Sequence, residues 1–477
     1  MATAAALPPV SVDALFRSEA RPARSRSLIG LCLVLGILID AQLFFKIKME
    51  NGKVLSNIQV DEDNYSKPLK LLLPIKYKEG GYVRWSTTGL AVTSKLNEWW
   101  TAEATIYALS ALLTVVSFVC SWLAFRSAVF TLFFTSIMAF GPQFNYAWIN
   151  GSCSVYYLFV SYAVVNLLSL YYLLAKPDEH PRRARWSFVL SLLALALCWE
   201  TWLDYFVFLS MLAALGYVWL VRHPAPRVRR SLDFMTLSTL CVAVPYLVVR
   251  IVYGGNHNQP GSECELITRH KHGILMVEDF VSNVFTYLYI SFMNFIPHWL
   301  LASNSLACLS DKELIASQNG YHAACQHYVP MHYHYFWHFQ AGMLVLAFFH
   351  SFIRLLVRGW REPTVHRCVL FALCLLILTG FCTHSLIKFR PYLSLPLLSY
   401  KATLSILGAA CLISYLAMLG WSRWSHSWKG HWVLGGGALV LMVTFLTHPS
   451  WQAKMQPKVG LSAPPDPLQF FERRAHR

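Results

Sequence analysis

An acidic cluster stands in the first long loop of the chain. Asp61, Glu62 and Asp63 are adjacent and Tyr65 follows them, in a segment whose other charged side chains are mostly lysines. A carboxylate that is partly desolvated and within hydrogen-bond reach of a hydroxyl group works as a general base. The cluster therefore has three interpretations, as a catalytic base, an ion site or a solvated loop. The elements around it decide among them.

The composition is that of a multi-pass membrane protein. Hydrophobic residues make up 56% and charged residues 13% of the 477 positions, and the mean hydropathy is +0.43. These values exclude a soluble domain. A net charge of +16 would suit nucleic-acid binding. The cationic clusters, however, stand in short loops between hydrophobic segments, where they indicate topology and contacts with anionic lipid headgroups.

Hydrophobic segments of about 20 residues predict about eleven transmembrane helices. We expect an all-α integral membrane fold with long outward loops after the first and seventh helices. Residues 1–27 would form a cytoplasmic segment, 28–447 the polytopic domain and 448–477 an outward tail. Residues 280–301 are predicted to form an interfacial or re-entrant helix. The predicted spans are 28–45, 105–125, 128–148, 155–174, 186–199, 203–221, 232–253, 337–357, 365–386, 396–419 and 432–447.

Arginine and lysine clusters orient these spans. They precede the first span and follow the fourth, sixth, eighth and tenth, which places them all on one side of the membrane and the N-terminus in the cytoplasm. Residues 186–221 have such clusters at both ends, and one helix of that length would be about 54 Å long, too long for a single crossing. We therefore expect a hairpin whose turn, from Glu200 to Asp204, faces outward.

The outward segments 46–103 and 254–336 hold nearly all the Asp, Glu and His side chains that could do chemistry. A site would therefore face the periplasm or the lumen. Four cysteines also fall outside the spans, and in an oxidising compartment they could form two disulfides. Cys308 with Cys325 is the preferred pair, because both stand in one loop. The other two are Cys153 and Cys264.

The acidic cluster and the aromatic segments after it resemble a known class of membrane enzyme. The loop contains Asp61-Glu62-Asp63-Asn64-Tyr65, and it leads into the second span through Tyr82-Val83-Arg84-Trp85 and Asn97-Glu98-Trp99-Trp100. This arrangement resembles the GT-C glycosyltransferases, in which the loop after the first helix carries an acidic motif and then runs along the membrane. The resemblance implies a GT-C-like fold. It also implies transfer of a sugar from a polyprenyl or dolichyl phosphate to a glycan, lipid or protein acceptor.

The resemblance also implies roles for individual residues. Asp61 or Asp63 would be the general base that deprotonates the acceptor hydroxyl. The departing lipid phosphate would be neutralised by cationic side chains. The transfer then needs no metal cofactor, although some members of the class use a divalent ion. The candidate cations are Lys67, Lys70, Arg84 and Arg390.

Further residues are expected to contact the substrate. Glu200 and Asp204 stand one helical turn apart and would share a face, either within the site or as a structural cap. Arg390 comes before Pro391 and Tyr392 and resembles the cationic, tyrosine-bearing ends of late GT-C helices; it would contact phosphate or snorkel to the interface. The predicted substrate-binding residues are Glu62, Tyr65, Lys67, Arg84, Glu200, Asp204, Arg390 and Tyr392.

Two other patterns suggest contacts. His334 and His338 would lie on one face of a helix, within a tract that also contains His322, His327 and His332. Because no carboxylate stands between them in an HExxH arrangement, we favour an aromatic-rich collar that grips a sugar or lipid headgroup over a metal site. Residues 435–437 are three consecutive glycines in the last span, and they predict close helix packing.

Two other functions stay open. An envelope-polysaccharide polymerase or ligase also uses a large outward loop and outward arginines, and it would be favoured if Arg and His side chains, not the Asp61 cluster, were essential. A transporter requires charges, broken helices and an internal repeat at mid-bilayer; mid-span charges are few here and no repeat is visible. The preferred function is a glycosyltransferase of the bacterial inner membrane, with the endoplasmic reticulum second.

Overall fold

The computed structural model describes residues 24–48, 75–76, 83–84, 88–100, 102–141, 155–176, 178–198, 203–222, 226–253, 331–361, 365–387, 403–424 and 428–446. Within these residues the regular structure is helical, apart from one short antiparallel pair of strands, β1 (Ile75–Lys76) and β2 (Val83–Arg84). The helices are α2 (Arg24–Lys48), α4 (Thr88–Trp99), α5 (Ala102–Phe125), α6 (Ala128–Phe140), α8 (Val155–Ala175), α9 (Pro181–Cys198), α10 (Leu203–Arg222), α11 (Pro226–Tyr253), α17 (Met331–Arg361), α18 (Val365–Ile387), α20 (Thr403–Trp424) and α21 (Trp428–Leu446).

The helices coincide with the predicted hydrophobic segments. Every predicted span overlaps one described helix, and α9 ends at Cys198 before α10 begins at Leu203, so residues 186–221 form two helices, as expected. One boundary was wrong. The third span was predicted to reach residue 148, but α6 ends at Phe140, and Gly141 caps it by donating to the Ile137 carbonyl at 2.7 Å. Pro142 explains the early end, because a residue before proline avoids the helical conformation.

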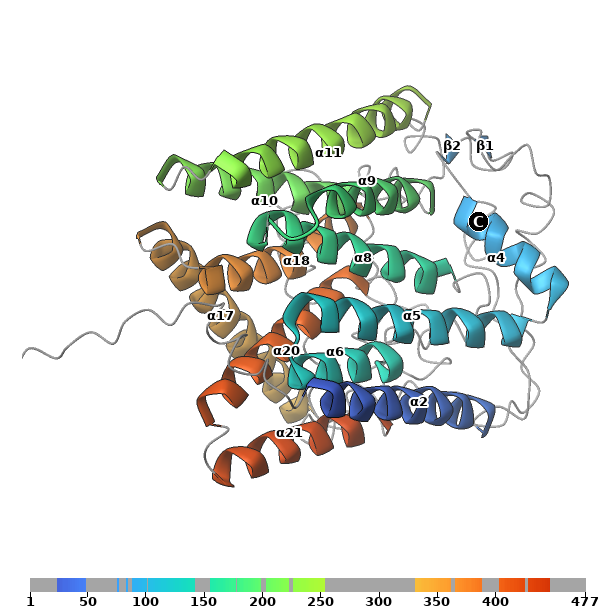
Figure 1. Ribbon diagram of the computed structural model, residues 1–477, viewed down its shortest axis with the longest axis vertical. Coiled ribbons are helices and arrows are strands. Elements are labelled where there is room, and N and C mark those ends of the chain that lie inside the picture. The colour runs from blue at the N-terminus through green and yellow to red at the C-terminus, as the bar shows by residue number, and fades with distance from the viewer. Residues whose placement is uncertain are drawn as a thin grey trace, which may run out of the picture.

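Three helices are long and apolar enough to cross a membrane, judged among the described residues by length and composition. They are residues 104–125 of α5, the whole of α8, and residues 403–422 of α20. Each also packs against several other helices, and these three lie toward the middle of the bundle (Figure 1). Helices of this kind indicate a membrane protein.

The outer helices carry stripes of exposed apolar side chains. On α9, Trp186, Leu190, Leu193 and Leu197 repeat at helical spacing and are 36–68% exposed. Soluble proteins rarely expose contiguous apolar surface of this extent, whereas a lipid-facing helix does so by necessity. The same pattern recurs on three other helices: Ile29, Leu33 and Ile37 of α2; Leu112, Val115 and Val119 of α5; Leu237, Leu240, Val244 and Val248 of α11.

The core of the bundle is a continuous cluster of buried apolar side chains from α5, α6, α8, α9, α10, α11, α18 and α20. A second cluster joins α17, α18 and α20, with Val345, Ile377 and Ile406 at its centre. Gly408 lets α18 and α20 approach closely, since a Cβ there would stand 2.9 Å from Ile377 Cγ1 and 3.0 Å from its backbone nitrogen. Small residues at such crossings are typical of membrane helices.

The three consecutive glycines of α21 do not serve this purpose. A Cβ added at residue 435, 436 or 437 would meet no other atom within 4 Å, and all three positions are exposed. The prediction of close packing there was therefore wrong for the contacts that the structure describes. Instead these glycines leave a smooth strip on the outer surface of α21, beside the exposed Trp432 and Leu439.

Buried polar side chains tie α8 to its neighbours. Asn166 is fully buried, and its Nδ2 donates to the Phe188 carbonyl at 3.0 Å and to Ser191 Oγ at 2.9 Å, both on α9. Tyr172 donates its hydroxyl to the Leu123 carbonyl of α5 at 2.9 Å. Because hydrocarbon offers no alternative partner, such bonds fix how neighbouring helices are rotated against each other.

Replacing Asn166 with Leu should destabilise the bundle. The change keeps the size of the side chain but removes both bonds to α9, at a cost of about 1 kcal/mol. We expect the thermal midpoint of the detergent-solubilised protein to fall by a few degrees, measured by fluorescence-detected size exclusion after heating. Ser414→Ala is the control, because Ser414 Oγ bonds only within its own helix, to the Ala410 carbonyl at 2.7 Å. Equal midpoints for the two variants would contradict the role given to Asn166.

Candidate functional site at the α4 end of the bundle

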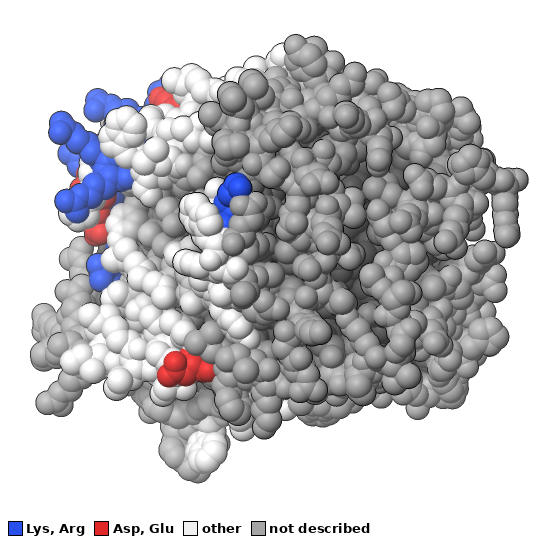
Figure 2. Space-filling model, turned by 90° about the vertical axis from the view of Figure 1, so that its right-hand side faces the viewer, with Lys and Arg blue, Asp and Glu red and all other residues white. Residues whose placement is uncertain are grey.

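Among the described residues, arginines of helix termini and short connections, including Arg182, Arg227 and Arg358, concentrate at one end of the bundle, here called the basic end. At the other, here called the α4 end, lie α4, the β1–β2 pair, the start of α8 and the end of α9 (Figure 1). Figure 2 looks at the α4 end, and most of the described Lys and Arg side chains in this view lie along one edge.

Helix α4 packs across the ends of α8 and α9 through a glycine. A Cβ at Gly89 would stand 2.5 Å from Cys198 Sγ, 2.6 Å from the Cys198 carbonyl oxygen and 2.8 Å from Val155 Cγ2. Two of these atoms belong to side chains, but the carbonyl is backbone at the last residue of α9 and cannot turn away. Only a residue without a side chain fits, so Gly89 fixes the distance between α4 and the bundle.

Helix α4 turns small residues toward the protein and apolar residues outward, which is the reverse of a soluble amphipathic helix. Thr93, one turn after Gly89, is only 2% exposed, so small residues face the protein. Val92 is 43% exposed and Trp99 74%. A helix with an apolar outer face and tryptophan at its end is typical of the membrane interface. Helix α4 thus lies at the rim of the bundle, with tryptophan at its exposed end.

The short strand pair organises the loop before α4. Ile75 is paired with Arg84, and Lys76 with Val83. Strand β2 also contacts α11. The segment that leads from the first helix to the second is therefore held at the rim by two attachments, the strand pair against α11 and α4 against α8 and α9.

Only some of the predicted site residues lie in described segments of the chain. Arg84 lies in β2 and Asp204 in the first turn of α10, and the structure places both elements at the α4 end, although their side chains are not among those described. The other predicted site residues lie outside the described residues: Asp61, Glu62, Asp63, Tyr65, Lys67, Lys70, Glu200, Arg390 and Tyr392. Their roles therefore stay predictions.

The histidine and cysteine predictions have a similar outcome. Helix α17 begins at Met331, so His334 and His338 are helical and one turn apart, while their side chains lie outside the described set. Among the side chains that the structure does describe, no group of three or more His, Cys, Asp or Glu could hold a metal. The six cysteines described are free and stand in helices; Cys153, Cys264, Cys308 and Cys325 are not described.

Helix α4 itself was missed by the sequence analysis, which treated residues 46–103 as a loop. Its signal is a pair of small buried residues one turn apart, Gly89 and Thr93, followed by the half-buried Leu96 at helical spacing. Analysis by apolar periodicity looks for a buried hydrophobic face, and here the buried face is the less hydrophobic one. The sequence feature that did mark this helix was the pair of tryptophans at its end, Trp99 and Trp100.

No protein-family model fits the sequence, and no curated protein is similar to it. The resemblance to GT-C enzymes therefore rests on the acidic motif and the arrangement of the spans.

Replacing Gly89 with Ala should detach α4 from the bundle. The added methyl group would overlap the carbonyl oxygen of Cys198, so α4 must shift away. We expect faster amide hydrogen exchange across residues 88–100, measured by mass spectrometry on the protein in lipid nanodiscs.

Gly436→Ala provides the matched control, because a methyl group at that position meets nothing. Unchanged exchange in both variants would show that α4 is not held through Gly89.

Proposed function

We propose that this chain is a GT-C-type glycosyltransferase with about eleven spans. Support comes from helices over every predicted span and from the lipid-facing stripes. The charge asymmetry supports an orientation in which the basic end faces the cytoplasm and the α4 end faces the periplasm or lumen. The proposed location is the bacterial inner membrane, with the endoplasmic reticulum as the alternative.

The observation that carries the proposal is the attachment of α4 to the ends of α8 and α9. An acceptor that meets a lipid-linked donor must do so at the membrane surface, because the sugar is polar and the donor tail is not. Gly89 holds α4, which follows the loop with the acidic cluster, against Cys198. Glu200 follows Cys198 by only two residues, so covalent geometry keeps its Cα within about 7 Å of that of Cys198. The proposal assigns the acidic cluster to this same rim.

The proposed reaction is a direct displacement. Asp61 or Asp63 takes the proton of the acceptor hydroxyl, and the oxygen attacks the anomeric carbon of the donor sugar. The bond between that carbon and the phosphate oxygen breaks, and the lipid phosphate leaves with the electron pair. Cationic side chains stabilise the charge that develops on it; Lys67, Lys70, Arg84 and Arg390 are the candidates.

The remaining candidates position the substrates. Glu62 and Tyr65 adjoin the base in the sequence and are assigned to the acceptor and the sugar hydroxyls. Asp204 begins the helix on the far side of the turn that holds Glu200, and Tyr392 stands beside Arg390. Carboxylates at a membrane rim are costly unless paired or used, which favours a binding role for Glu200 and Asp204.

Asp61→Asn and Asp63→Asn test the base. We expect one of them to lower sugar transfer by the purified, reconstituted protein by at least about 100-fold, the usual contribution of a general base. Transfer would be followed from a panel of labelled polyprenyl-phosphate sugars. Asp40→Asn is the control, because Asp40 is an exposed carboxylate of α2.

Transfer that survives both substitutions would rule out the Asp61 cluster as the base. Loss of activity on replacing Arg390, with both Asp variants active, would favour the polymerase or ligase alternative. If the protein moved a substrate across the vesicle membrane but transferred sugar from none of the donors, the transporter alternative would replace the enzyme.

A further inference from the structure

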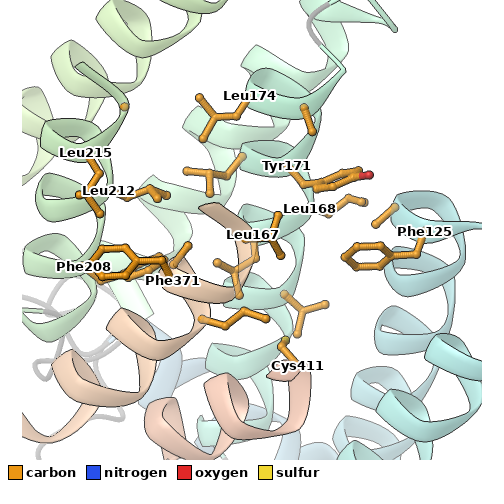
Figure 3. A pocket seen from close by; sticks show the side chains of 18 of the residues that line it. Phe125, Leu167, Leu168, Tyr171, Leu174, Phe208, Leu212, Leu215, Phe371 and Cys411 are labelled. Carbon is orange, nitrogen blue, oxygen red and sulfur yellow. The ribbon is translucent and has the colours of Figure 1, made fainter. Parts of the chain in front are cut away.

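A cavity of about 270 Å³ lies inside the bundle. Its walls come from α5, α6, α8, α10, α11, α17, α18 and α20, and they are almost wholly apolar. Figure 3 shows Phe208, Leu212 and Leu215 of α10 and Phe371 of α18 on one side, with Phe125 and Tyr171 on the other. A cavity of about 150 Å³ with such a lining stays dry and takes up an apolar ligand. The larger volume here therefore suits a hydrocarbon chain.

The cavity occupies one half of the bundle. It reaches from Val164 to Ala175 along α8, which at 1.5 Å per residue is a depth of about 16 Å. On α17 it is lined by residues near the last turns, and on α18 by residues of the first turns. These are the ends at which the basic connections lie. The depth matches one leaflet of a bilayer, about 15 Å.

The cavity is partly open and not enclosed. Leu356 of α17 belongs to its lining and is 39% exposed. We place the entrance beside α17, where a lipid chain could enter sideways from the surrounding leaflet without crossing the polar headgroup layer.

Charge gathers at the mouth. Arg367, in the first turn of α18, is the one permanently charged residue among the described lining residues, and the exposed Arg358 and Arg361 stand in the last turn of α17. Among the described residues of the basic end, Lys and Arg outnumber Asp and Glu. This part of the chain therefore presents positive charge to the headgroup layer.

We propose that this cavity is a binding site for one acyl chain of an anionic phospholipid from the leaflet at the basic end, with the headgroup phosphate at Arg367. The apolar walls take the chain, the depth fits one leaflet, and Arg367 stands where the phosphate of such a lipid would lie. The occupant is a membrane lipid and not the sugar donor, because the donor must react at the α4 end, in the opposite leaflet. The exclusion of the donor rests on the proposed function, whereas the lipid site itself rests on the cavity and on Arg367.

Photocrosslinking tests the site directly. The probe is phosphatidylglycerol with a diazirine in one acyl chain, added to phosphatidylcholine nanodiscs that hold the full-length protein. We expect crosslinks on residues 164–175 of α8 and 369–373 of α18. Crosslinks confined to the exposed stripes of α2, α9 and α11 would overturn the proposal, since those positions contact bulk lipid.

Two substitutions with matched controls separate the chain from the headgroup. Ala372→Phe fills the cavity and should abolish the internal crosslinks, whereas Ala438→Phe, the same change on α21 away from the cavity, should leave them intact. Arg367→Gln should lower the preference for phosphatidylglycerol over a phosphatidylcholine probe about fivefold, whereas Arg183→Gln, an exposed arginine of α9 outside the lining, should not. Leu168→Trp fills the same cavity from α8 and replaces Ala372→Phe if that variant does not fold.

Three further outcomes would overturn the assignment. If internal crosslinks persist in a folded cavity-filling variant, the chain does not occupy this cavity. If the wild-type protein captures the two phospholipid probes equally, it does not recognise the headgroup by its charge. If unlabelled polyprenyl phosphate displaces the probe more strongly than unlabelled phosphatidylglycerol, the cavity belongs to the donor lipid.

Discussion

Hydrocarbon accepts no hydrogen bonds, and this constraint governs the whole bundle. Backbone groups are satisfied inside helices, and buried hydroxyls mostly bond back to the carbonyl one turn earlier, as Thr114 does to Ser110 at 2.9 Å and Ser161 to Tyr157 at 2.7 Å. These hydroxyls are thus satisfied within single helices, whereas those of Ser117, Thr131 and Thr135 are buried without a hydrogen-bond partner among the described residues. The few polar side chains whose hydrogen bonds join two helices, such as Asn166, therefore do most to fix how the helices are rotated against each other.

The same constraint explains why glycines matter at some places and not at others. In lipid there is little hydrophobic drive for helices to associate, so close contact must supply the attraction. Gly408 and Gly89 stand where a neighbouring backbone approaches within 3.0 Å of a Cβ position, whereas the three glycines of α21 face open space. A glycine therefore indicates close helix packing only where another element contacts it. The sequence of one helix cannot show whether such a contact exists.

The sequence was sufficient to predict the long hydrophobic helices but not their surroundings. Hydrophobic length depends on each segment alone, so these helices and the break between Cys198 and Leu203 could be predicted. Helix α4 was missed because its buried face is made of small residues, and the cavity could not be foreseen because its walls come from eight helices. Of the candidate site, only Arg84 and Asp204 have a described backbone position, and the assignment of a base stays a prediction.

The contact of α4 also sets the order in which the protein can assemble. At Gly89 it packs against Val155 and Cys198, which are both synthesised after it. Helix α4 therefore cannot complete this contact until α5, α6, α8 and α9 have been made and inserted. The rim is then closed by an early segment that packs onto helices made later. An arrested chain that ends before residue 181 would contain all of α4 and none of α9, against which α4 packs.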